Sequence, residues 1–199
     1  MNSIYGKFYS GSSYQTDWIA VRDANASLRD PSKLTYVDKS ADFNFAAVKT
    51  LKGKSIDLKK RGKNKVVIYQ IMGTWCPNCI DEIHFFKELY TKYHDQGLEI
   101  VALAYEVGND EKSQIRRLKA FKKRLGIPYE VMLAGTSSKE VASSQFPMLN
   151  GIMSFPTSVI VGKNGNIEYV HTGFSGPATG DTYEKYTKEM KVILEGLLK

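Results

Sequence analysis

Cys76 and Cys79 are the only cysteines in this chain of 199 residues, and they stand two residues apart in the stretch GTWCPNCIDEIHFF at 73–86. The stretch follows VVIYQIM at 66–72, a short run of β-branched and aromatic residues that predicts a buried strand. From 77 to about 94 the apolar residues recur with a helical period, and a proline in the first turn favours a helix start. The chain must therefore fold so that a Cys-x-x-Cys pair lies where a buried strand passes into a helix.

Strands and helices alternate along the rest of the chain. The pattern predicts these further elements in order: a strand at 98–106, a helix at 111–125, a strand within 127–135, a short helix near 139–146, a hairpin about Asn164-Gly165 and an amphipathic helix at 182–199. Alternation of this kind predicts an α/β fold with helices on the faces of a sheet.

The N-terminal part has a different character. Residues 1–40 are rich in Tyr, Ser and Asp and show little periodicity, although 5–21 is compatible with a strand or a short hairpin. The stretch ADFNFAAVKTLKGKSIDLKK at 41–60 predicts two short strands about Lys52-Gly53. We therefore expect one globular domain at 41–199, preceded by an N-terminal extension at 1–40.

The net charge of +7 raises the question of a nucleic-acid partner. The densest basic segment, 112–124, carries apolar residues at spacings of three and four, so its charges are expected on the solvated face of a helix. No nucleic-acid motif accompanies it, and we expect no such partner. No apolar run approaches the roughly 18 residues of a membrane span, and the first residues lack the pattern of a signal peptide.

Two roles without redox chemistry, a structural disulfide and a metal site, have little support in the sequence. A disulfide across two residues closes a very small loop, so it would stabilise the fold little. A metal site would need His84 and His94 as well, but these lie ten residues apart on the predicted helix, about 15 Å at its rise per residue. The spacing also fails to match usual zinc sites, so we expect no metal.

A redox role suits the setting of the pair. At a helix N-terminus, unpaired N–H groups and the helix dipole favour a thiolate at Cys76 and lower its thiol pKa below about 8.5. Cys79, one turn further on, is close enough to attack a mixed disulfide formed at Cys76. This geometry supports thiol–disulfide exchange with an outside partner.

A second feature is FPT at 155–157, which leads into the apolar strand SVIVG. Proline before a central strand is unexpected unless a special turn uses it. From position alone, a cis Phe155–Pro156 bond and an ordinary proline at a strand start fit equally well.

With GTWCPNC, SFPTSVIVGKNGNI and this order of elements, the chain resembles the thioredoxin superfamily. It is most similar to the extracytoplasmic branch, the TlpA/ResA-like thiol–disulfide oxidoreductases, from about Ala41 to the C-terminus. The resemblance implies a thioredoxin-like fold with a central mixed sheet flanked by helices, an N-terminal hairpin extension and an insertion before the cis-proline segment. It also implies that Pro156 is that cis-proline and faces the active site.

The resemblance also assigns roles to single residues. Cys76 resembles the family's nucleophile, Cys79 its resolving thiol and Glu82 its buried acid, which tunes proton transfer. From the residues alone, Glu82 could equally be an exposed first-turn carboxylate that the helix dipole favours. Gln70 stands where thioredoxin has a buried aspartate, and being neutral it leaves any acid–base role to Glu82 or water. Residues expected to contact a client protein are Trp75, Pro77, Phe155 and Pro156.

One departure concerns the dipeptide between the cysteines. The branch commonly has proline just before the second cysteine, whereas Pro77 follows the first. Because this dipeptide helps to set the redox potential, the direction of exchange stays open at this point. His84, little more than a turn past Cys79, is expected to be solvated.

We therefore predict a thiol–disulfide oxidoreductase that exchanges a Cys76–Cys79 disulfide with cysteines of client proteins, as a reductant. Its partners would be the clients and a redox partner that resets the pair, with no cofactor. The resemblance implies a periplasmic or otherwise extracytoplasmic location, and a membrane anchor, if the protein has one, lies outside this sequence. The alternatives are a binding module with idle cysteines and a thiol peroxidase, although Gly73 stands where a peroxidase needs Ser or Thr.

Overall fold

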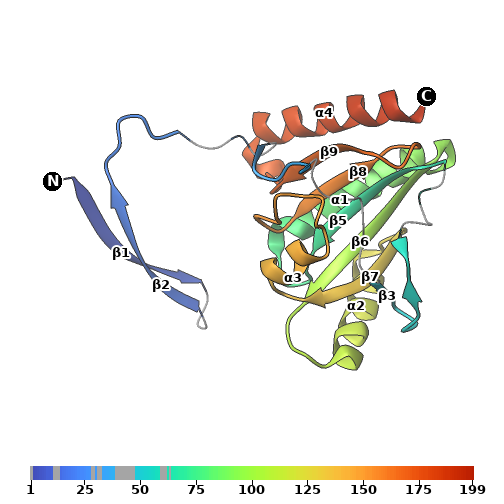
Figure 1. Ribbon diagram of the computed structural model, residues 1–199, viewed down its shortest axis with the longest axis horizontal. Coiled ribbons are helices and arrows are strands. Elements are labelled where there is room, and N and C mark those ends of the chain that lie inside the picture. The colour runs from blue at the N-terminus through green and yellow to red at the C-terminus, as the bar shows by residue number, and fades with distance from the viewer. Residues whose placement is uncertain are drawn as a thin grey trace.

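The main body of the protein is built on a seven-stranded mixed sheet with the order β4-β3-β7-β6-β5-β8-β9 (Figure 1). Strands β5, β6 and β7 run parallel, whereas β3, β8 and β9 join the sheet antiparallel. The strands are β3 (Val48–Thr50), β4 (Ser55–Ile56), β5 (Val66–Met72), β6 (Leu98–Glu106), β7 (Glu130–Thr136), β8 (Thr157–Val161) and β9 (Ile167–Thr172). This computed structural model describes residues 2–10, 14–27, 30, 33–38, 48–58, 62 and 64–199.

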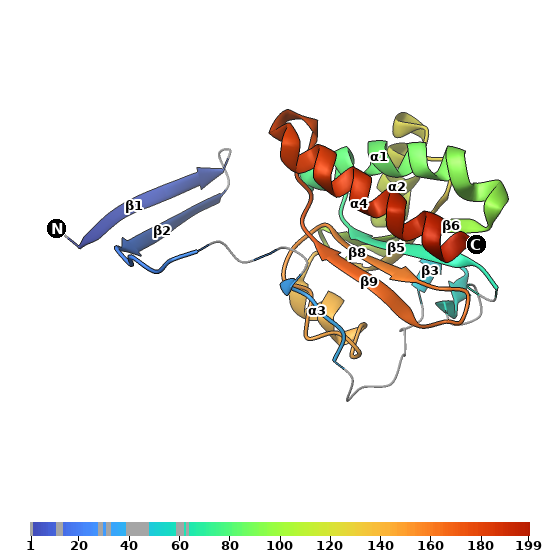
Figure 2. The ribbon, with the colours of Figure 1, turned by 90° about the horizontal axis from the view of Figure 1, so that it is seen from above.

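Helices cover both faces of the sheet (Figure 2). The long helices α1 (Pro77–Tyr93), α2 (Glu111–Leu125) and α4 (Asp181–Leu198) lie on one face, and the short α3 (Lys139–Ser144) lies on the other. The predicted α/β fold with a central mixed sheet flanked by helices is confirmed. None of the helices in the described part of the chain is long and apolar enough to cross a bilayer.

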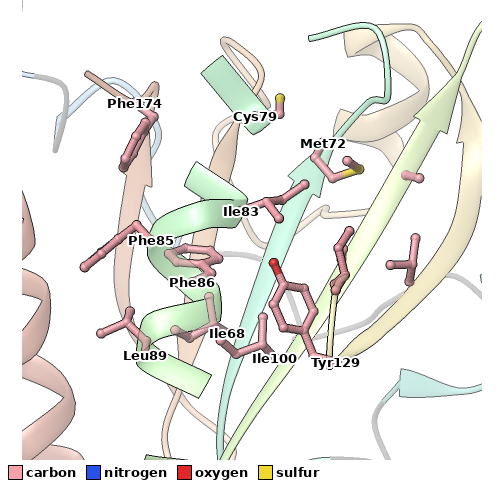
Figure 3. Close-up of a cluster of buried hydrophobic side chains, with 14 of the residues drawn as sticks. Ile68, Met72, Cys79, Ile83, Phe85, Phe86, Leu89, Ile100, Tyr129 and Phe174 are labelled. Atoms are coloured by element: carbon pink, nitrogen blue, oxygen red, sulfur yellow. The ribbon is translucent and has the colours of Figure 1, made fainter. Parts of the chain in front are cut away.

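Two apolar clusters fill the spaces between the sheet and its helices. The larger joins α1, α2 and α4 to the sheet, and the smaller lies on the side of α3. All seven residues of β5 are buried because both faces of this strand are covered. Figure 3 shows Cys79 at one end of the larger cluster, near Met72 and Ile83. The helix that carries the cysteines is thus anchored in the core.

The predicted elements of this body are found, with small differences at their ends. β7 begins at Glu130, later than the predicted strand, because α2 ends in a left-handed Gly126 and the N–H of Ile127 still bonds to the carbonyl of Lys122 at 3.1 Å. The short helix α3 ends at Ser144, two residues early. The strands about Lys52-Gly53 are β3 and β4, whereas 41–47 of that predicted hairpin lies outside the described residues.

The N-terminal extension contains a second, separate sheet. Strands β1 (Ser3–Ser10) and β2 (Tyr14–Val21) form an antiparallel hairpin that stands away from the main body in both views (Figures 1 and 2). Its large apolar side chains are exposed, Tyr5 to 76% for example. The looser prediction of a strand or short hairpin at 5–21 is therefore met by a hairpin.

A short segment of the extension, 33–38, is attached to the main body. The N–H of Tyr36 donates to Oδ1 of Asn150 at 2.8 Å, and the N–H of Asn150 donates back to the carbonyl of Tyr36 at 3.0 Å. Thr35 is fully buried, and its hydroxyl accepts a hydrogen bond from the hydroxyl of Thr172 at 2.8 Å. The predicted domain boundary at 40/41 lies outside the described residues and stays a prediction.

Candidate active site

Cys76 and Cys79 form a disulfide at the start of α1. Cys76 is the N-cap residue, and its Sγ accepts a hydrogen bond from the backbone N–H of Cys79 at 3.2 Å. The exposed Pro77 occupies the first helical position, where a missing N–H costs no hydrogen bond. The sulfur of Cys76 therefore lies at the positive end of the helix dipole, which favours a thiolate after reduction.

The two cysteines differ in their access to solvent. Cys76 is 5% exposed, whereas Cys79 is fully buried in the larger apolar cluster (Figure 3). An outside thiol or disulfide can therefore reach the pair only at Cys76. It must do so through a small opening in the surface.

Aromatic side chains border this opening. The indole of Trp75 is 44% exposed, and its Nε1 donates to the carbonyl of Tyr105 at 2.9 Å. Its ring meets the ring of Phe155 edge-on, with 5.3 Å between centroids. A Cβ at Gly73 would lie 2.3 Å from Nε1 of Trp75, so this position of the indole requires glycine at residue 73.

The segment before β8 lies beside the cysteine loop. The Phe155–Pro156 peptide bond is cis, as predicted. Pro156 is buried, and its carbonyl accepts from the N–H of Gly173 at 2.8 Å, whereas Phe155 is partly exposed. The contact between Phe155 and Trp75 thus brings together two residues 80 positions apart that the sequence assigned to one client-binding surface.

Glu82 is fully buried beneath the disulfide, one helical turn after Cys79. Its Oε2 accepts from Nε2 of Gln70 at 2.8 Å, and its Oε1 accepts from the hydroxyl of Ser158 at 2.8 Å and that of Tyr186 at 3.5 Å. Burial raises the pKa of this carboxyl from 4.5 to about 7, although the three hydrogen bonds oppose the shift. The alternative of an exposed first-turn carboxylate is therefore wrong.

Gln70 connects Glu82 with the cysteine pair. Besides Glu82, its Nε2 is 3.4 Å from the carbonyl oxygen of Cys79. The amide is fully buried in β5, and its own Oε1 has no partner among the described residues. A neutral side chain thus holds the carboxyl next to Cys79 without adding a charge to the site.

The matching family model is Redoxin, which covers residues 37–186. The chain belongs to the Redoxin family.

Individual relatives agree with this placement. Over 147 residues the chain is 31% identical to the thiol-disulfide oxidoreductase ResA of Bacillus thuringiensis subsp. konkukian, a match that covers 74% of this chain and 75% of that protein. ResA of Halalkalibacterium halodurans is 30% identical over 130 residues, 65% of each chain. These matches bear out the predicted place in the TlpA/ResA-like branch of the thioredoxin superfamily and, with it, the predicted activity of thiol–disulfide exchange.

Solved structures show the same fold. A thiol:disulfide interchange protein of the thioredoxin family from Chlorobium tepidum has a TM-score of 0.56 at 23% identity, over 80% of this chain and 99% of that one. A DsbF homologue from Corynebacterium diphtheriae has a TM-score of 0.61 at 17% identity, over 86% and 99%.

The Redoxin-family site contains a second buried carboxylate that our sequence reasoning missed. Glu106, the last residue of β6, accepts from the backbone N–H and the hydroxyl of Thr74, each at 2.8 Å. Nε of Arg117 lies 3.5 Å from the same carboxylate. Because Thr74 comes just before Trp75 and Cys76, this carboxylate fixes the loop that carries Cys76. A charged residue at the end of a buried parallel strand was the signal for it, since ligand sites of such sheets lie at that edge.

Other candidate groups lie outside this Redoxin-family site. His84 is exposed, as expected for a solvated residue. Within the described ranges, no three His, Cys, Asp or Glu side chains come together as metal ligands would.

Proposed function

We propose that this protein reduces disulfides in client proteins, using Cys76 as the nucleophile and Cys79 as the resolving thiol. The observation that carries the proposal is the buried carboxyl of Glu82, which has a pKa of about 7 one turn below Cys79. Such a group can accept a proton near neutral pH from a thiol that is buried in the core.

The first step takes place at Cys76. The reduced protein presents the Cys76 thiolate, which the N-terminus of α1 stabilises, and this sulfur attacks one sulfur of the client disulfide. A bond forms between Cys76 and the client, and the other client sulfur leaves as a thiolate. The small opening beside Trp75 and Phe155 restricts this attack to an accessible client disulfide.

The second step releases the client. Cys79 loses its thiol proton to the Glu82 carboxylate and attacks the sulfur of Cys76, so the mixed disulfide breaks and the second client thiolate departs. The client gains two electrons, and Cys76–Cys79 returns to the disulfide seen here. A redox partner must then supply two electrons to reset the pair.

The charge near Cys79 supports the proposed direction of exchange. An ionised carboxylate in a desolvated site disfavours a second negative charge on a neighbouring sulfur. Glu82 thereby destabilises the thiolate form of the reduced pair, which makes the pair a better electron donor. This supports a reductant.

Client contacts are assigned to Trp75, Pro77, Phe155 and Pro156. Trp75 and Pro77 are exposed on either side of Cys76, and Phe155 packs on Trp75. The backbone at Phe155, before the cis-proline, is the part of this surface that would pair with an extended client segment. We also place the protein outside the cytoplasm, in the periplasm or its equivalent, because the branch it resembles is extracytoplasmic.

Replacing Cys79 tests this mechanism. Cys79→Ala should leave a client covalently bound to Cys76, because the resolving thiol is absent. The adduct should run as a larger species on a non-reducing gel and disappear on reduction. The matched control, Cys76→Ala, should form no adduct, since the remaining Cys79 is fully buried.

Insulin reduction with dithiothreitol gives the corresponding activity assay. The wild-type protein should accelerate the precipitation of insulin chains, and both single-cysteine variants should be inactive. The proposal fails if Cys79→Ala captures no client and the wild-type protein leaves the insulin rate unchanged.

A further inference from the structure

The side chain of Tyr186 separates the buried Glu82 from a pocket that is open to solvent. Its hydroxyl donates to Oε1 of Glu82 at 3.5 Å, while the same side chain lines a pocket of about 360 Å³ beside α4. Tyr186 itself is 7% exposed. Gln70 and Ser158, the other hydrogen-bond partners of Glu82, do not line this pocket.

His171 supports Tyr186 from the pocket side. The two ring centroids are 4.4 Å apart, and Nδ1 of His171 lies 3.4 Å from the hydroxyl of Tyr169. Ser158 is the direct partner of His171 in the β8–β9 pairing, so both side chains stand on the same face of the sheet. The pocket wall and the carboxyl site are therefore adjacent in one row across these strands.

A buried carboxyl that takes up a proton must also release it. If Glu82 takes the proton of Cys79, as the proposed function holds, the client is still bound at Cys76 at that moment and covers the opening. The pocket beside α4 has a different lining, which includes none of the residues at that opening: Asp30, Tyr169, His171, Thr182, Lys185, Tyr186 and Glu189. A proton that leaves on this side does not pass the client.

We propose that Tyr186 is the gate between Glu82 and solvent, and that the pocket lined by His171 is the outlet for the proton that Glu82 takes from Cys79. In the closed position the ring keeps water from the carboxyl. When the ring turns aside, pocket water reaches Glu82, the carboxyl O–H bond breaks, and the proton passes to water. Tyr186 keeps its own proton throughout and acts as a positioning residue.

The protonation states of the titratable groups around this gate leave Glu82 as the group that gives up the proton. Burial lowers the pKa of His171 to about 4, so this ring is neutral when Glu82 titrates. Burial and the charge of Glu82 raise the pKa of Tyr186 and of Tyr129 well above the ordinary value, so neither phenol ionises. The remaining groups on the pocket are one amine and two carboxyls, with a further phenol whose pKa burial also raises: Lys185, Asp30, Glu189 and Tyr169.

The infrared band of the protonated Glu82 carboxyl, followed against pH, tests the gate. The band is assigned by its loss in Glu82→Gln. Tyr186→Ala opens the pocket to Glu82 and should lower the midpoint by about one pH unit, because water relieves the burial that raises the pKa. Tyr186→Phe keeps water out but removes a hydrogen bond to the charged form, so it should raise the midpoint.

Exchange of the carboxyl proton tests the outlet. After transfer into D2O, the band should shift to its deuterated position about tenfold faster in Tyr186→Ala than in the wild type, because the closed ring limits local access.

Matched controls come from the same helix. Tyr183 lies one turn earlier on α4 and packs edge-on against Phe85 at 6.3 Å without bonding to Glu82. Tyr183→Ala and Tyr183→Phe should therefore leave the midpoint and the exchange rate at wild-type values.

Opposite shifts for the two Tyr186 variants support the gate. An unchanged midpoint in Tyr186→Ala, shifts in the same direction, or an unchanged exchange rate would overturn it. Should Tyr186→Ala not fold, His171→Ala removes the supporting ring and should shift the midpoint in the same downward direction, and no shift there overturns the proposal as well. The band reports on Glu82 directly, so a failure here is distinct from a failure of client trapping or insulin reduction.

Discussion

Glu82 combines two properties that single residues rarely share, full burial and an ionisable group. Three side chains donate hydrogen bonds to it, yet burial still outweighs them and raises its pKa to about 7. A carboxyl in this condition is neutral at mildly acid pH and charged at mildly alkaline pH. The same residue therefore links the proposed proton transfer from Cys79 to the stability of the fold.

This linkage predicts how stability changes with pH. Between the ordinary pKa of 4.5 and the folded value of about 7, the unfolded chain releases a proton that the folded protein keeps, so the free energy of unfolding falls as pH rises. Above the pKa of the folded protein, the decrease in the free energy of unfolding is complete and amounts to about 3 kcal/mol. Glu82→Gln should not show this loss in urea unfolding compared from about pH 5 to about pH 8. Parallel pH profiles for the two proteins would contradict the assignment.

At the scale of the elements, the junction from β5 to α1 could be predicted because the sequence on each side of it has a strong pattern. A run of seven buried residues and a helical period with a proline at its start fix where Cys76 lies. The burial of Glu82 could not be predicted in this way. The local sequence is the same whether a carboxylate three residues after Cys79 is exposed or buried. One of the side chains that contact it, Tyr186, lies more than 100 residues later, and its position depends on how α4 packs.

Contacts between β6, α3 and β7 also keep the aromatic residues beside the site in position. The hydroxyl of Tyr105 on β6 donates to Oε1 of Gln145 at the end of α3 at 2.7 Å, and Nε2 of Gln145 donates to the carbonyl of Ala134 on β7 at 2.8 Å. The ring of Tyr105 in turn packs against Phe155, with 5.8 Å between centroids. Gln145 thus links α3 to the segment expected to hold a client.

We therefore predict that Gln145→Ala lowers the free energy of unfolding by about 2 kcal/mol, because it leaves the buried Tyr105 hydroxyl without an acceptor. Tyr105→Phe in the Gln145→Ala background should recover part of this loss, as measured by urea unfolding in a double-mutant cycle. Strictly additive effects of the two substitutions would show that the hydrogen bond contributes nothing.

At the scale of the whole molecule, the N-terminal extension has two parts with different relations to the main body. The hairpin of β1 and β2 stands apart, and its side chains are largely exposed. The segment at 33–38 is bonded to the loop at 148–151 and buries Thr35 against Thr172. We propose that the folded unit includes this segment and does not include the hairpin.

Two truncations separate these parts. Removal of residues 1–27 should change the free energy of unfolding by less than about 0.5 kcal/mol, as for exposed surface positions. Removal of 1–38 should lower it by about 2 kcal/mol, because buried hydrogen bonds are lost. Thr35→Val in the full chain is the matched control and should give part of the second effect. Equal free energies of unfolding for the two truncated proteins would contradict the proposal that 33–38 belongs to the folded unit.

The redox potential of the Cys76–Cys79 pair, measured in glutathione buffers, tests the central claim most directly. With a buried carboxylate beside Cys79, we predict a reducing pair with a potential close to that of thioredoxin, about −270 mV. A value near about −120 mV, the range of strong disulfide-forming oxidants, would contradict the claim that this protein donates electrons to its clients.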